Sequence, residues 1–157
     1  MFRIRTSRSL QRLYIATLLT VGCLLGLPAQ GQEDISVQRG EYTVYYSVFN
    51  TSFLSPENAR AISVVRARDR GLVNISVARA GEPGTLPVTR VSGSYFNLVH
   101  RHTLEFREVI EPGAVYYLAQ FDINSNDETI VFDIEVTADE TGTSIPVKFQ
   151  RQMFFNE

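Results

Sequence analysis

The chain has two histidines, His100 and His102, whose spacing could support metal chemistry. Alternate residues of an extended backbone point the same way, so both imidazoles would face one side, as in a zinc site. The nearest carboxylate that could be a third ligand, Glu105, would lie on the opposite face from His102. The pattern favours a solvated loop between strands, with metal binding through His100 and His102 as the alternative.

A second oxygen-rich stretch, Asp122-Ile-Asn-Ser-Asn126, is similar to the start of a calcium-binding loop, with Asp133 at the twelfth position. The sixth position, where such loops need glycine, is Asp127, and Asp133 belongs to an alternating apolar segment. Asn, Ser and Asp are also typical of hairpin turns. We therefore interpret the Asp122 loop as a turn, and keep metal or small-ligand binding as the alternative.

Four arginines form the best candidate interaction surface: Arg60, Arg66, Arg68 and Arg70. The last three alternate with other residues, so an extended backbone would present their guanidinium groups on one side. Arginine binds carboxylates and phosphates in bidentate geometry, which suits anionic lipid headgroups or an acidic partner. The alternative is a plain solvated face.

Catalysis finds little support in the sequence. No Gly-x-Ser-x-Gly motif occurs, and a Ser-His-Asp site would have to use one of the two histidines. No glycine-rich phosphate loop is present. A pair of catalytic carboxylates depends on spatial proximity, which the sequence does not reveal. We expect no catalytic residue and no cofactor.

Residues 1–31 have the composition of a secretory signal peptide. Four arginines precede the apolar run 13–27, no carboxylate is present, and Ala29-Gln30-Gly31 offers small residues to a signal peptidase. The apolar run has about 15 residues, fewer than the roughly 20 of a spanning helix. We expect cleavage after Gly31 and export to the periplasm. Retention as an anchor and lipidation at Cys23 are the alternatives.

Removal of this leader leaves residues 32–157, the length of one ordinary domain. The mature chain keeps 11 of the 15 basic residues and all 17 acidic ones, a net charge near −6 that disfavours nucleic-acid binding. Cys23 is the only cysteine, so the mature chain forms neither a disulfide nor a thiolate metal site. We expect a periplasmic domain with no membrane span and no nucleic-acid partner.

The mature chain is dominated by strand-like alternation. The residues on one face of the segment after the Pro-Gly turn are all apolar: Val115, Tyr117, Ala119, Phe121 and Ile123. The flanking runs 104–109 and 129–136 predict an antiparallel meander with this segment. Further strands are expected over 41–49, 72–78, 88–98 and 145–155, with Gly93 marking a bulge or a close approach.

One helix interrupts the strands. Ser55-Pro56-Glu57 combines a hydroxyl cap, a proline at the first helical position and an acid in the first turn, which predicts a short helix over 56–61. Seven or eight strands at roughly 8–12-residue spacing indicate an all-β, two-sheet antiparallel sandwich. Tyr117 stands where immunoglobulin-like domains often keep a corner tyrosine, so we expect an immunoglobulin-like arrangement.

Several segments carry a resemblance to a known family: 45–61, Gly71-Leu-Val-Asn-Ile-Ser-Val77, 104–109 and 115–121. The chain resembles domain-of-unknown-function family 4426, small exported proteins of Gram-negative bacteria. The resemblance implies export and a β-rich domain, and it supplies no activity, cofactor or catalytic residue.

Two functions are compatible with these observations. The first is a non-catalytic periplasmic β-sandwich that binds another component of the cell envelope, through a sheet edge or through the arginines. The alternative is a metal- or small-ligand-binding domain, with or without enzymatic activity, that uses His100, His102 or the Asp122 loop.

Overall fold

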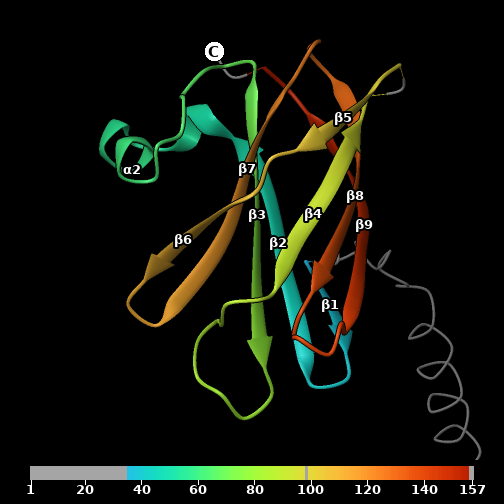
Figure 1. Ribbon diagram of the computed structural model, residues 1–157. Coiled ribbons are helices and arrows are strands. Elements are labelled where there is room, and N and C mark those ends of the chain that lie inside the picture. The colour runs from blue at the N-terminus through green and yellow to red at the C-terminus, as the bar shows by residue number, and fades with distance from the viewer. Residues whose placement is uncertain (1–34, 98, 156–157) are drawn as a thin grey trace, which may run out of the picture. The chain divides into compact units, whose positions relative to one another are not determined.

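A computed structural model describes residues 35–97 and 99–155 (Figure 1). The leader predicted over 1–31, with Cys23, lies outside the described residues. In chain order the elements are β1 (Ser36–Arg39), β2 (Tyr42–Asn50), η1 (Thr51–Phe53), α2 (Pro56–Ala61), β3 (Arg70–Arg79), β4 (Arg90–Phe96), β5 (Arg101–Leu104), β6 (Arg107–Glu111), β7 (Ala114–Asp122), β8 (Glu128–Thr137) and β9 (Ser144–Met153).

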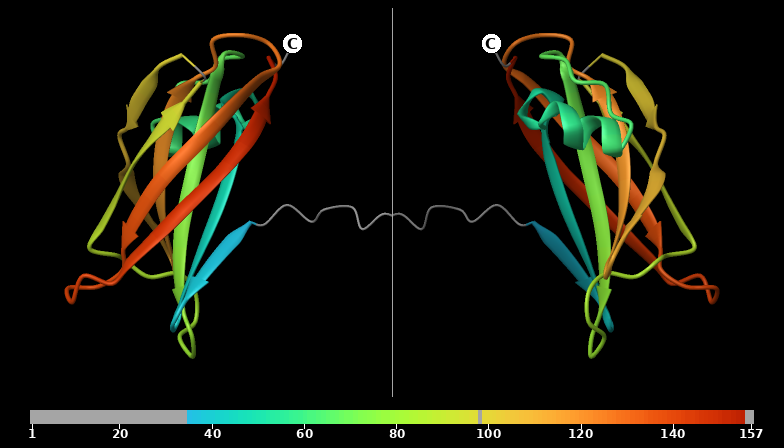
Figure 2. Two further views of the ribbon diagram at one scale, coloured as in Figure 1. Left: turned by 90° about the vertical axis from the view of Figure 1, so that its right-hand side faces the viewer. Right: turned by 90° about the vertical axis from the view of Figure 1, so that its left-hand side faces the viewer.

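The described strands form two antiparallel sheets. The first sheet has the order β1-β2-β3-β7-β6, and the second has the order β5-β4-β8-β9. The sheets lie in two layers, and the strands of one layer run at an angle to those of the other (Figure 2). This arrangement confirms the predicted all-β, two-sheet sandwich with one short helix.

The core lies between the two sheets because each strand turns its apolar alternate residues to the same side. In β8, for example, Ile130, Phe132, Ile134 and Val136 are all fully buried, and the residues between them are not. The first sheet contributes the inner faces of β2, β3 and β7 to the same cluster. The alternation that predicted the strands therefore also predicted which of their residues form the core.

A continuous series of aromatic rings joins the two sheets. The centroid of Tyr46 in β2 is 4.4 Å from that of Phe149 in β9, which stacks at 4.9 Å on Phe132 in β8. Phe132 meets the edge of Phe121 in β7 at 5.1 Å, and Phe121 lies 5.6 Å from Tyr95 in β4. Each such contact adds specific geometry to the burial of apolar area.

Two glycines allow close approaches in the sandwich, Gly71 to a ring of this series and Gly93 to the neighbouring strand β8. A Cβ atom at Gly71 would lie 2.0 Å from the ring of Phe121, and one at Gly93 would lie 2.8 Å from the carbonyl oxygen of Asp133. The close approach predicted at Gly93 is thus confirmed. Neither position has space for a side chain without movement of its neighbours.

The predicted meander is confirmed for one pairing, because β6 and β7 form an antiparallel hairpin, and it is wrong for the third strand. The run 104–109 is divided, because β5 ends at Leu104 in the second sheet and β6 begins at Arg107 in the first. The run 129–136 lies in β8, which belongs to the sheet opposite β7. A short polar loop can lead either to a neighbouring strand or across the core, and the alternation of apolar residues is the same in both cases.

The predicted helix is confirmed as α2, with the predicted bounds. The hydroxyl of Ser55 accepts a hydrogen bond from the Asn58 N–H at 3.1 Å, and a proline occupies the start of the helix. The helix covers the outer face of the first sheet, where Ala59 packs in a small cluster with Val64, Leu72 and Leu118. Neither described helix has the length and apolarity needed to cross a membrane.

Loss of Phe132, the central ring of the series, should greatly reduce the stability of the fold. Phe132→Ala deletes a fully buried ring that contacts both sheets, so the free energy of unfolding should fall by about 3–5 kcal/mol. The neighbouring Val131 points to the other face and is 37% exposed, so Val131→Ala should cost less than about 1 kcal/mol. Urea denaturation measures both; equal losses would contradict the assignment of the core.

Candidate functional site

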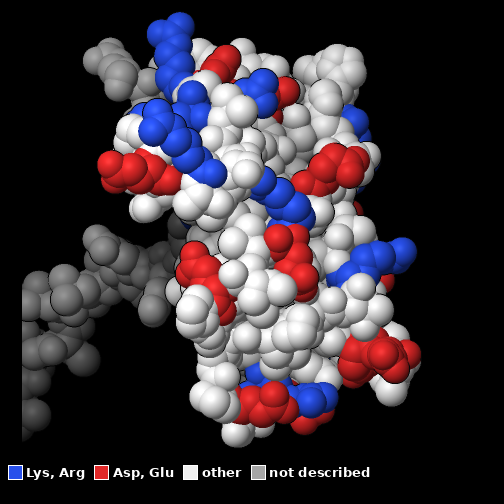
Figure 3. Space-filling model, turned by 60° about the vertical axis from the view of Figure 1, so that its left-hand side comes forward, with Lys and Arg blue, Asp and Glu red and all other residues white. Residues whose placement is uncertain are grey.

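The arginine surface, which consists of Arg60, Arg66, Arg68 and Arg70, lies at the end of the sandwich that carries α2. Arg60 is in the last turn of α2, Arg66 and Arg68 belong to the segment that leads into β3, and Arg70 is the first residue of β3. Figure 3 shows basic side chains gathered at this end of the molecule. The predicted surface residues therefore lie in one region.

Buried polar side chains hold the segment beneath the arginine surface. The Thr51 hydroxyl donates to the Ala67 carbonyl at 3.1 Å and accepts from the Ala67 N–H at 3.0 Å. The Asn50 amide donates to the carbonyls of Arg68 at 3.4 Å and Phe154 at 2.6 Å. Asn50 and Thr51 are both buried, so these bonds fix the segment against the sandwich.

The four arginines differ in their partners. Arg70 forms an ion pair with Asp122, its cross-strand neighbour, at 3.6 Å. Arg66 donates to the Ser52 carbonyl at 3.1 Å, and the guanidinium of Arg68 lies 5.8 Å from the ring centroid of Phe155. A turn at 68–69 breaks the extended backbone, so the three guanidinium groups do not form one row.

Three of these arginines are free of carboxylates. Within the described part of the chain, the ion pairs that satisfy a 4 Å limit do not include Arg60, Arg66 or Arg68. All three side chains belong to exposed residues. Their positive charge is therefore available to an external anion.

Exposed apolar side chains lie beside the arginines, and the sequence analysis missed them. Phe53 is 69% exposed, Val65 59% and Phe154 52%. Leu54 and Val64 pack on the cluster under α2, so the residues adjacent to them, Phe53 and Val65, are left outside it. No pattern in the sequence distinguishes Phe53 from Leu54, because both are apolar residues just before a helix.

The two predicted metal-binding elements converge on one hollow, which we call the histidine groove. It has a volume of about 570 Å³. One wall comes from the β4–β5 connection and the start of β5, with Asn97, Val99, His100 and His102. The other comes from the β7–β8 connection and the start of β8, with Asn124, Ser125, Asp127, Glu128 and Thr129. The sequence identified both elements, and the fold brings them together.

The groove offers polar and aromatic contacts. The ring of His102 stacks on Tyr95 with centroids 4.8 Å apart, and the His100 and His102 centroids are 6.2 Å apart. Glu128 accepts a hydrogen bond from the Asn124 N–H at 2.8 Å.

Among residues 35–97 and 99–155, no three or more potential ligands are grouped to hold a metal ion. Asp133 lies within β8, 3.4 Å from Lys148.

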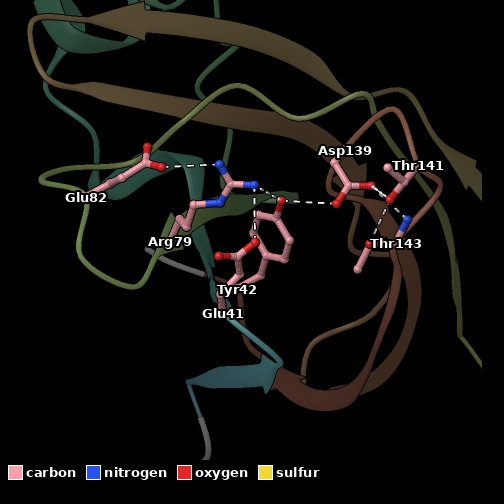
Figure 4. Close-up of polar contacts among 7 residues, drawn as sticks. All are labelled: Glu41, Tyr42, Arg79, Glu82, Asp139, Thr141 and Thr143. Atoms are coloured by element: carbon pink, nitrogen blue, oxygen red, sulfur yellow. Dashed lines mark hydrogen bonds and ion pairs between the residues drawn. The ribbon is translucent and has the colours of Figure 1, made fainter.

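At the start of β2, Tyr42 links the two sheets in an arrangement that we call the Tyr42 bridge (Figure 4). The Tyr42 hydroxyl accepts a hydrogen bond from Arg79 at the end of β3. It donates to Asp139, in the β8–β9 hairpin, at 3.1 Å. Arg79 also lies 3.3 Å from Glu41 and 3.2 Å from Glu82. The bridge thus fastens the first sheet to a hairpin of the second.

Local hydrogen bonds set the electrostatics of the Tyr42 bridge. The Thr141 hydroxyl donates to Asp139 at 2.6 Å and the Thr143 N–H donates at 3.1 Å, and these bonds hold the pKa of the Asp139 carboxyl well below its usual value. Burial, followed by the hydrogen bond to Asp139, raises the pKa of Tyr42. The charged groups already face partners within the protein, so we assign this site a structural role.

Tyr117 bonds the backbone of Val88, 29 positions upstream, whereas the corner tyrosine of immunoglobulin-like domains bonds backbone only a few residues upstream. The Tyr117 hydroxyl accepts from the Val88 N–H at 2.8 Å and donates to Glu108 at 2.8 Å. Burial is the main cause that raises the pKa of Tyr117 to about 12. The residue therefore stays neutral at physiological pH, and anchors the segment before β4.

Comparisons with known proteins support the fold. The model of DUF4426, a domain of unknown function, matches residues 36–156. The chain is also similar to a crystal structure, at 2.09 Å resolution, of a DUF4426 family protein from Pseudomonas aeruginosa PAO1. The two share 39% sequence identity with a TM-score of 0.66, over 78% of this chain and 95% of that chain. A comparison with curated proteins gave no match.

The Tyr42 bridge predicts an acid-dependent loss of stability. The depressed pKa of Asp139 stabilises the fold at pH values above the unfolded pKa of about 3.9, and this stabilisation disappears as the pH falls through the folded pKa. Asp139→Asn should therefore lower the melting temperature at neutral pH, and the difference from the wild type should shrink in acid.

Thermal melts of both proteins between about pH 7 and about pH 2 measure this difference. Glu140→Gln, in the same hairpin and exposed, is the control and should follow the wild type. A difference that stays constant with pH would show that Asp139 acts through its shape and not through its charge.

Proposed function

The chain belongs to the DUF4426 family, and we propose that it is an exported, non-catalytic binding module that contacts another component of the cell envelope through the arginine surface. The predicted leader over 1–31 supports export to the periplasm. The mature chain has no cysteine and thus needs no disulfide to fold there.

The observation that carries the proposal is the presence of unpaired arginines on an acidic protein. Residues 35–155 contain 11 basic and 14 acidic residues, yet the segment 51–70 contains four arginines and only two carboxylates. Arg60, Arg66 and Arg68 are exposed and have no carboxylate partner in the described part of the chain. Such a local excess attracts anionic groups, while the rest of the surface repels them.

The histidine groove supports a second candidate function, the binding of a small polar ligand or a metal ion. The supporting observation is that two connections distant in sequence line one hollow of about 570 Å³. His102, whose ring stacks on the buried Tyr95, gives this hollow an aromatic surface, and Asp127 and Glu128 give it carboxylates. A ligand with hydrogen-bonding groups fits this lining better than a purely apolar one.

The first candidate predicts binding to washed envelope membranes that depends on charge. The double variant Arg66→Glu and Arg68→Glu should co-sediment with these membranes at least several-fold less than the wild-type mature chain, because two attractive charges become repulsive. Added salt should weaken wild-type binding through screening.

The matched control changes the net charge by the same amount elsewhere. The control double variant is Arg39→Glu with Arg90→Glu. Both arginines are exposed and lie far from α2, Arg39 as the last residue of β1 and Arg90 as the first residue of β4. This variant should bind like the wild type. If both double variants lost membrane binding equally, binding would depend on the net charge of the protein and not on the arginine surface.

The second candidate predicts a ligand-dependent rise in melting temperature. A metal that binds only the folded state raises the melting temperature by mass action. If the groove takes zinc, copper or calcium, the rise should vanish in a variant with His100→Gln and His102→Phe, where Phe preserves the stacking on Tyr95. A thermal-shift series with no rise for any of the three ions rules out metal binding by the groove.

A further inference from the structure

We propose that the component bound by the arginine surface is the anionic headgroup layer of a lipid bilayer, with the apolar side chains beside the arginines inserted at its boundary. This inference rests on the proposed function and names its partner class. It is carried by the combination of unpaired cations with exposed apolar side chains at one end of the molecule.

The apolar side chains supply the first step. Phe53 is 69% exposed, Val65 59% and Phe154 52%. A single exposed apolar residue needs no explanation. Three on segments that meet those carrying Arg66 and Arg68 have the composition of surfaces that lie at the membrane interface, where apolar groups enter the acyl boundary and cations remain among the headgroups.

Contacts between the segments place these residues together. Arg66 donates to the carbonyl of Ser52, which directly precedes Phe53. The Asn50 amide binds the carbonyls of both Arg68 and Phe154, so the segments that carry these two residues meet at one side chain. The cations and the apolar side chains thus form one surface.

The surface is also held rigidly. Gln120, on the outer face of β7, makes two hydrogen bonds with the backbone of Val65. Its Nε2 donates to the Val65 carbonyl at 2.9 Å, and its Oε1 accepts from the Val65 N–H at 3.2 Å. Thr51, which is fully buried, fixes Ala67 by two further hydrogen bonds. Little backbone order remains to be gained on binding, which lowers the cost of association.

The shape of the surface favours a lipid layer over a folded protein. The side chains of Phe53 and Val65 are exposed outside the cluster under α2, while those of their neighbours Leu54 and Val64 pack in it. Protruding apolar side chains enter a fluid boundary without a complementary pocket, whereas a folded partner must provide one.

The absence of tryptophan from the chain permits a direct test. Phe53→Trp introduces the single tryptophan of the chain at the proposed point of insertion, and its emission can be excited apart from that of the tyrosines. Its emission should shift to shorter wavelength with vesicles of phosphatidylglycerol and phosphatidylcholine in equal parts, and should not shift with phosphatidylcholine alone. Ile110→Trp, at a position that is 71% exposed on β6, should not respond to either vesicle.

Charge variants test the electrostatic half of the proposal. In vesicle co-sedimentation, Arg66→Glu with Arg68→Glu should weaken binding to the phosphatidylglycerol vesicles about ten-fold or more. Phe53→Ser should also weaken it, and Arg39→Glu with Arg90→Glu should not. Circular dichroism of each variant confirms that a loss of binding is not a loss of fold.

The outcomes separate this inference from the proposed function. If the vesicles are not bound, but washed envelope membranes still retain the protein through Arg66 and Arg68, the partner is a protein and the lipid proposal is wrong. If neither is bound, both proposals are wrong. Vesicle binding that is indifferent to the arginine variants also overturns the lipid proposal.

Discussion

The contact between the inner faces of the two sheets is the interaction on which the rest of the structure depends. Its centre is the ring series from Tyr46 through Phe149, Phe132 and Phe121 to Tyr95, which passes between the layers more than once. Residues 35–97 and 99–155 contain no cysteine, and no three or more potential metal ligands are grouped among them, so neither a disulfide nor a metal site replaces this packing there. Burial of apolar area is therefore the main source of its stability.

A core of this kind leaves the two ends of the sandwich free to differ. At the start of β2, the Tyr42 bridge pairs Arg79 with Glu41 and Glu82, and joins it through Tyr42 to Asp139. Around α2, the arginines face outward. The contrast has a simple physical meaning: charges that are already paired stabilise the fold, and charges that are not remain available for recognition.

The arginine surface and the histidine groove consist largely of connecting segments that a rigid scaffold holds in place. Asn50 and Thr51, at the junction of β2 and η1, hold the arginine segment, while β4 and β8 support the two sides of the groove. Neither region contributes to the main core. Both can therefore change in sequence without loss of the sandwich, which suits a scaffold that presents binding surfaces.

The sequence by itself determined most of the strands, the helix and the inward residues, although it missed β1 and the break between β5 and β6. Alternation marked Val115 to Ile123, and the cap at Ser55 marked α2, because both signals depend on neighbours along the chain. The candidate residues at positions 60–70 and 100–102 were also identified by type and spacing alone.

Only the tertiary structure decided which strands share a sheet and which distant residues meet. Alternation states which face of a strand is apolar, but not which strand lies beside it, so β8 was expected next to β7 and lies in the opposite sheet. For the same reason Tyr42 and Asp139, 97 positions apart, could not be paired from the sequence. The exposure of Phe53 was likewise decided by packing, because Leu54 and not Phe53 fills the space beside α2.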